Sequence, residues 1–242
     1  MKNTNDGASS IRVLLVKNTN DGAKTWEFLH IFIPTMSTAT PYSNPAINLI
    51  YNLLFCDDLN LFKANQTPPF AYPFDVLFSD ASTVADLQKL IDAPNSEPRL
   101  KILSYNKQAS LGYKVDKKDL LAVIVEVGLE DGLDVLASFK DGTARYINQT
   151  GKLIVWEMTG DEEANRITKD LFAKSEDIVK KIGPWDQPRR SHPAEGTVRI
   201  TFLVSDGLYF GEGPIDVLFN DAIAGPSLGA ATELLQFLTE KG

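Results

Sequence analysis

Ser227 has the strongest motif for covalent chemistry in this sequence. It lies in Gly225-Pro-Ser-Leu-Gly229, which matches the G-x-S-x-G nucleophile elbow of hydrolases. In that motif a sharp turn from a strand into a helix exposes the serine hydroxyl, and the catalytic histidine follows later in the chain. Here no histidine follows Ser227, the candidate base His192 lies upstream, and Pro226 is typical of the first turn of an ordinary helix. A small-molecule hydrolase that uses Ser227 is therefore the alternative function.

Glu126 is a second candidate for catalysis, because it interrupts the apolar run that begins at Leu120. A carboxylate inside a central strand loses solvation, which raises its pKa toward the range that a general acid or base needs. The competing interpretation is that Glu126 lies near a strand end and reaches water or Arg145 on a neighbouring strand. With two histidines and one cysteine in the chain, we expect neither a metal site nor a bound cofactor.

A basic and aromatic loop is the first candidate binding site. Arg189 and Arg190 precede His192, and Trp185 lies just before them, within the proline-rich segment 183–196. Loops carry binding residues disproportionately, and this pair of arginines could bind an acidic partner or a phosphate. The competing interpretation is a solvated loop without a ligand.

A glycine-rich segment, Ser205–Pro214, is the second candidate binding site. Helix N-termini attract anions, but the segment lacks the P-loop pattern, and Asp206 and Glu212 would repel a phosphate. We interpret it as a hairpin followed by a helix. If Tyr209 and Phe210 are exposed there, they form a rim that could bind a protein partner or a second copy of the chain.

The composition excludes several classes of function. The chain has 242 residues and a net charge of −8, and such an acidic surface repels nucleic acid and anionic lipid. No apolar run approaches the length of a membrane span, and the first residues lack the apolar centre of a signal peptide. A single cysteine, Cys56, excludes an intrachain disulfide. We therefore expect an acidic, soluble, cytoplasmic protein that binds neither nucleic acid nor membranes.

The centre of the chain predicts an antiparallel meander. No proline occurs between Arg99 and Gly183, and Asp-Gly turns at 131–132 and 141–142 favour tight hairpins. The strands that we expect are 120–128, 133–139, 143–148 and 152–157. We predict an α+β fold in which helices cover one face of this four-stranded sheet, with a further strand at 198–204 and a short one at 208–210.

Helices are expected on either side of the meander. Thr159-Gly-Asp-Glu162 resembles a capping box that opens a helix ending near Gly183. Upstream, 46–56 and 83–91 have helical spacing, and 12–16 and 26–33 are expected to be strands. We expect an N-terminal α+β region over 11–98 and a C-terminal one over 99–242, or the two fused into one domain.

The sequence contains two internal repeats. Lys2–Ala8 recurs as Lys17–Ala23, which indicates a short duplication, and we expect residues 1–10 to be disordered. Pro73–Ala81 recurs as Pro214–Ala222 with two substitutions. In each copy we expect a short helical turn that starts near the proline and carries an aspartate in its first turn. This longer repeat raises the hypothesis that the protein consists of two duplicated halves.

Two segments of the C-terminal half, Asp141–Glu157 and Phe202–Pro214, resemble parts of bacterial proteins of unknown function. The resemblance implies a bacterial origin but no activity, substrate or catalytic residue. Since no complete catalytic or cofactor motif is present, the leading interpretation is a non-catalytic binding or regulatory protein of the bacterial cytoplasm. The partner could be another protein or a second copy of the chain.

Overall fold

The computed structural model describes residues 13–17, 26–30 and 39–241, which belong to two compact units, residues 1–37 and 38–242. In the first unit β1 (Val13–Lys17) pairs antiparallel with β2 (Trp26–His30), so both expected strands are present. The expected disorder of residues 1–10 lies outside the described residues. In the second unit, segments on both sides of the expected boundary at residue 98 share one core.

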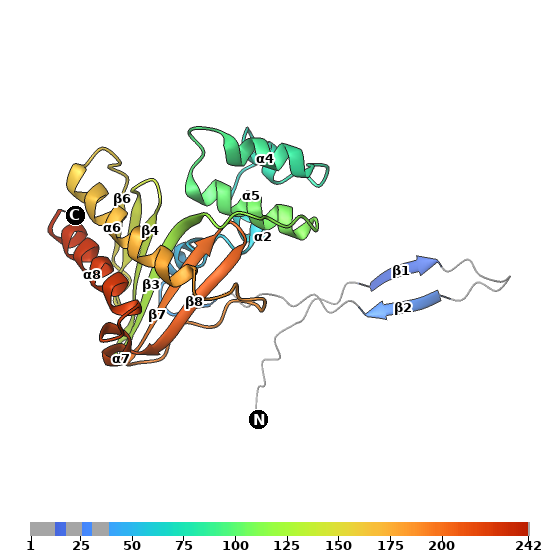
Figure 1. Cartoon of the computed structure of the whole chain (residues 1–242). Coiled ribbons are helices and arrows are strands. Elements are labelled where there is room, and N and C mark those ends of the chain that lie inside the picture. Colours follow the sequence, from blue (N-terminus) through green and yellow to red (C-terminus); the bar gives the residue numbers. More distant parts are fainter. Residues whose placement is uncertain (1–12, 18–25, 31–38, 242) are drawn as a thin grey trace, which may run out of the picture. The chain divides into compact units, whose positions relative to one another are not determined.

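The second unit is built on a six-stranded antiparallel sheet with the order β6-β5-β4-β3-β7-β8 (Figure 1). The predicted meander is confirmed, and the hairpin of the last two strands extends it along the edge of β3. The strands are β3 (Leu120–Leu129), β4 (Gly132–Phe139), β5 (Ala144–Ile147), β6 (Leu153–Trp156), β7 (Thr197–Val204) and β8 (Gly207–Pro214). The sheet therefore has more strands than the four of the predicted meander.

Helices cover both faces of this sheet, not the single face that we expected (Figure 1). Val123 and Val125 of β3 face the core under α6 (Glu162–Val179) and α8 (Ala224–Lys241). Ala122 and Ile124 face a second core under α1 (Pro45–Leu53), α4 (Val84–Asp92) and α5 (Pro98–Ser110). The continuous apolar run of β3 accounts for this arrangement. Both faces of the strand carry apolar side chains, so helices must cover both of them.

The remaining helices are short. They are α2 (Leu59–Ala64), α3 (Phe74–Leu77) and α7 (Ile215–Phe219). Among the described helices, none is both long and apolar enough to cross a membrane.

The longer repeat forms α3 and α7, and in both copies the helix begins directly after the proline, as predicted. Asp75 and Asp216 both lie in the first turn of their helices. The surroundings differ, because a loop precedes α3 and β8 runs directly into α7, and the two helices pack against opposite faces of the sheet. The duplication of two halves stays a prediction.

The N-cap of α6 is Asp161, whose side chain accepts a hydrogen bond from the backbone N–H of Ala164 at 2.9 Å. The capping box that we expected to open at Thr159 is therefore wrong by two residues. Thr159 lies outside the helix, and its carbonyl accepts a hydrogen bond from the side chain of Asn165. An aspartate at the cap also places a negative charge at the positive end of the helix dipole.

Asp161→Ala should lower the free energy of unfolding by about 1 kcal/mol, because the N–H of Ala164 loses its acceptor. Thr159→Ala is the matched control and should change stability by less than about 0.5 kcal/mol. Chemical denaturation of both variants measures the difference. A larger loss for Thr159→Ala than for Asp161→Ala would contradict the assignment of the cap.

Candidate functional site

Glu126 and Arg199 lie side by side in the centre of the sheet. The register places Glu126 of β3 opposite Arg199 of β7, and Arg199 opposite Glu212 of β8. These three side chains point to the face that α1 covers, where Glu126 is fully buried and the side chain of Arg199 is 4% exposed. A row of charged groups thus crosses the sheet, from the buried Glu126 and Arg199 to Glu212 on the exposed edge strand β8.

The carboxylate of Glu126 has two neighbours. The hydroxyl of Tyr51, in α1, donates a hydrogen bond of 2.6 Å to Oε1, and Nη1 of Arg199 lies 3.6 Å from Oε2. Oε2 is buried and has no hydrogen-bond partner among the described residues. The competing interpretation is wrong on both counts, because the fully buried Glu126 does not reach solvent and β4 separates it from Arg145 on β5.

Burial dominates the protonation of this cluster. Loss of solvation raises the pKa of Glu126, while the charge of Arg199 and the hydrogen bond from Tyr51 act in the opposite direction. Burial and the nearby Glu126 also raise the pKa of Tyr51, so the hydroxyl keeps its proton and donates a hydrogen bond to the carboxylate. Glu126 therefore has the raised pKa predicted for a carboxylate inside a central strand.

Arg199 lies between two carboxylates. Its Nε donates to Oε2 of Glu212 at 2.6 Å, and its Nη2 lies 2.5 Å from the same oxygen. The guanidinium also stacks near the ring of Phe210, 5.6 Å from the ring centroid. Glu212 therefore completes a charged pair at the sheet edge, instead of standing as an isolated acidic residue in a glycine-rich loop.

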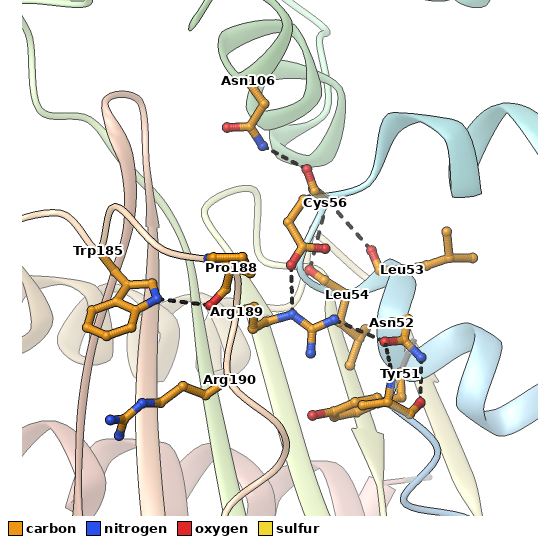
Figure 2. A network of polar contacts seen from close by, with 12 residues as sticks. Tyr51, Asn52, Leu53, Leu54, Cys56, Asn106, Trp185, Pro188, Arg189 and Arg190 are labelled. Carbon is orange, nitrogen blue, oxygen red and sulfur yellow. Dashed lines mark hydrogen bonds and ion pairs between the residues drawn. The ribbon is translucent and has the colours of Figure 1, made fainter. Parts of the chain in front are cut away.

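Arg189 connects the loop 183–196 to the end of α1 and to the segment that follows it. Its Nε donates to Oδ2 of Asp57 at 2.7 Å, its Nη2 donates to Oδ1 of Asn52 at 3.0 Å, and its guanidinium lies 3.9 Å from the ring centroid of Phe55. Figure 2 shows Arg189 reaching toward Asn52, beside Tyr51. With a side chain only 11% exposed, Arg189 is not the solvated residue of the competing interpretation.

The end of this loop passes directly over Gly128, the penultimate residue of β3. A Cβ at that position would lie 2.0 Å from the carbonyl oxygen of Ala194, a distance that two unbonded atoms do not reach. The backbone N–H of Gly196 donates to the carbonyl of Gly128 at 3.0 Å. Only glycine allows the loop to cross the strand this closely.

Arg190 lies on the outer side of the same loop, among aromatic rings. Its guanidinium is 5.4 Å from the ring centroid of Trp185 and 5.6 Å from that of Phe210, and the two rings meet edge to face at 5.2 Å. Trp185 is fixed by its indole N–H, which donates to the carbonyl of Pro188 at 3.1 Å (Figure 2). Its backbone N–H donates to the carbonyl of Leu208. The predicted binding residues Trp185, Arg190 and Phe210 are thus neighbours.

Asp206 and Tyr209 lie apart from this group. Tyr209 is fully buried, so its predicted exposure is wrong, and its hydroxyl donates to Oδ2 of Asp206 at 2.8 Å. The cause is the alternation along β8, which turns Tyr209 toward Phe202 and the core under α6 and α8. Phe210 points to the opposite face and remains partly exposed. A rim formed by Tyr209 and Phe210 together therefore does not exist.

Ser227 does not occupy a nucleophile elbow. It lies inside α8, which follows α7 and not a strand, and it is fully buried with its Oγ 2.7 Å from Oγ of Ser175 in α6. His192 is in the loop on the other face, with Nδ1 3.3 Å from the carbonyl of Pro193. The sequence matched the motif without the strand and the histidine that give it its chemistry.

The described residues contain no group of three or more histidine, cysteine or acidic side chains placed to hold a metal ion. Sequence reasoning missed several residues of the cluster: Tyr51, Asn52, Asp57 and Arg199. Arg199 had a usable signal, because it interrupts an apolar strand as Glu126 does, with the opposite charge. The other three had none, since their contacts join segments far apart in the chain.

Glu126→Gln tests the protonation of the buried carboxylate. Because its pKa is raised in the folded state, the folded protein binds more protons than the unfolded chain, and this contribution to stability is lost as the pH rises through the raised pKa. The free energy of unfolding of the variant minus that of the wild type should therefore increase with pH above the usual glutamate range, and then level off. Denaturation at a series of pH values measures this difference, and a decrease with pH would contradict the raised pKa.

Arg189→Met should lower the free energy of unfolding by about 2 kcal/mol, because Asp57, whose side chain is 17% exposed, loses its charged donor. Arg190→Met is the matched control in the next residue. Since Arg190 is exposed, the control should cost less than about 0.5 kcal/mol. Equal losses for the two variants would show that the loop is not fixed through Arg189.

Comparison of the sequence with protein-family models and with curated proteins finds no match. The site consists of two buried charged residues beneath a loop, Glu126 and Arg199, and an exposed arginine between aromatic rings on that loop. The two buried residues are named here the buried charged row.

Proposed function

We propose that this protein is a non-catalytic binding protein that recognises carboxylate groups on a partner protein. The recognition surface consists of Trp185, Arg190 and Phe210, named here the Arg190 surface. The observation that carries the proposal is the exposed guanidinium of Arg190 beside two aromatic rings. Its proposed setting is the bacterial cytoplasm. The bacterial origin rests on the resemblance of 141–157 and 202–214 to bacterial proteins, and the cytoplasm rests on the single cysteine, which suits a reducing compartment.

The chemistry of Arg190 suits an acidic partner. Rings that contact the face of a guanidinium leave its N–H groups at the edge, where a carboxylate can accept two of them at once. Among the described residues, no group accepts a hydrogen bond from the side chain of Arg190, so this edge has no competing partner there. Arginine and tryptophan are also the residues that most often dominate the energy of protein interfaces.

The loop beneath the Arg190 surface is already ordered by Arg189, Gly128 and the backbone contact of Trp185. A binding group that is fixed before association loses less conformational entropy on binding. The net charge of −8 opposes the approach of an acidic partner, but charges farther away than about 8 Å are largely screened at physiological ionic strength. Local contacts with Arg190 therefore decide the affinity.

The buried row supports a structural role for Glu126. Its carboxylate lies beneath Tyr51 and beside Arg199 and is fully buried, so the group that meets a partner is Arg190, not Glu126. Ser227 lacks a base, as described above. We therefore favour binding over hydrolysis.

Selection from a random peptide library on the immobilised full chain tests the proposal. Peptides rich in aspartate and glutamate should be enriched, and calorimetry should show saturable binding of these peptides to the wild type. Arg190→Ala should weaken this binding by roughly tenfold or more.

Arg166→Ala is the matched control, because Arg166 is an exposed arginine of α6 that pairs with Glu163 and Glu233. It should bind the selected peptides as the wild type does. No enrichment of acidic peptides, or equal binding to Arg190→Ala and the wild type, would overturn the proposal.

A further inference from the structure

A separate cavity of about 450 Å³ lies on the α1 side of the sheet, at its β5–β6 edge. Its volume is within the range of small-molecule sites, about 300–1,000 Å³. Most of the wall is apolar and comes from α1, α2 and β6; Leu54, Phe62 and Leu153 are representative. None of these residues belongs to the Arg190 surface or to the buried charged row.

Two arginines, Arg99 and Arg145, are the charged residues among those that line this mostly apolar cavity. Arg145 comes from β5 and has a side chain only 10% exposed, while Arg99 lies in the first turn of α5. Both guanidinium groups belong to the wall of this one cavity, and burial, followed by the positive charge of Arg99, lowers the pKa of Arg145. Two like charges beside an apolar space are costly unless an anion joins them.

The acidic partners of these arginines do not occupy the cavity. Arg145 donates to Glu157, whose side chain is 56% exposed, and Arg99 lies 3.2 Å from Glu97, whose side chain is 65% exposed. Among the described residues that line the cavity, none is acidic. Both carboxylates lie mostly in solvent, so neither neutralises its arginine from inside the cavity.

Donors remain for a ligand. The guanidinium of Arg145 donates through Nη1 to the carbonyls of Ala144 and Trp156 and through Nη2 to Glu157. Its Nε–H and one N–H of Nη2 have no acceptor among the described residues, and only Nη2 of Arg99 has one. The amides of Asn65 and Gln66 add further polar groups to the wall.

We propose that this cavity binds an aliphatic carboxylate, with the carboxylate between Arg99 and Arg145 and the hydrocarbon chain against the apolar wall. A guanidinium pairs with a carboxylate through two parallel hydrogen bonds, which a neutral head group cannot match. The apolar wall gains from the burial of each methylene group of the chain. Both parts of the ligand are therefore needed for affinity.

Calorimetric titration of the full chain with decanoate, below the concentration at which it forms micelles, tests this site. Decanoate should bind saturably with one site per chain. Acetate carries the charge without the chain, and decanol carries the chain without the charge; each should bind at least roughly tenfold more weakly. Absence of saturable decanoate binding, or decanol binding as tightly as decanoate, would overturn the proposal.

Substitutions in and outside the cavity test whether decanoate binds there. Arg99→Gln should weaken decanoate binding by roughly tenfold, and Arg166→Gln, on the other face of the sheet, should leave it unchanged. Two substitutions of opposite charge at Val155 test the site without placing a charge in the core, because this cavity residue of β6 is 51% exposed. Val155→Glu should weaken binding and Val155→Lys should not. Equal affinities for these two variants, with unchanged thermal stability, would place decanoate elsewhere and refute the site.

Discussion

The pairing of Glu126 with Arg199 inside the sheet is the constraint on which the rest of the site depends. Taking a carboxylate and a guanidinium out of water costs several kcal/mol for each ion, and this cost is offset only if other polar groups surround the pair. Tyr51 from α1 and Glu212 from β8 supply those groups. The pair therefore requires α1 to pack where Tyr51 reaches Glu126. It also requires the β7–β8 hairpin to extend as far as Glu212, which contacts Arg199.

Much of the fold was predictable because its signals are local. Asp-Gly turns and the absence of proline from 99 to 183 predicted the meander, and proline followed by aspartate predicted both short helices of the repeat. Helix α5 was missed, since its residues from Pro98 to Ser110 have no clear apolar face. The covering of both faces was misjudged, although the unbroken apolar run of β3 was its signal.

The candidate site was predictable only where a residue type was unusual for its surroundings. Glu126 in an apolar strand and the arginines beside Trp185 fit that description. Tyr51 and Asp57 could not be found, because they meet Glu126 and Arg189 across separations of 75 and 132 residues. Ser227 shows the opposite error, since a short pattern matched while the strand and histidine that give it meaning were absent from its surroundings.

The close crossing of Ala194 over Gly128 also constrains how this sequence can change over time. Any side chain at position 128 forces the loop off β3, and the loop carries Arg189 away from Asp57 as it moves. A related protein with alanine or a larger residue there must therefore have a different path for the segment 184–196. In such a lineage Arg189 and Asp57 would no longer be selected as a pair, and the three positions should be gained or lost together.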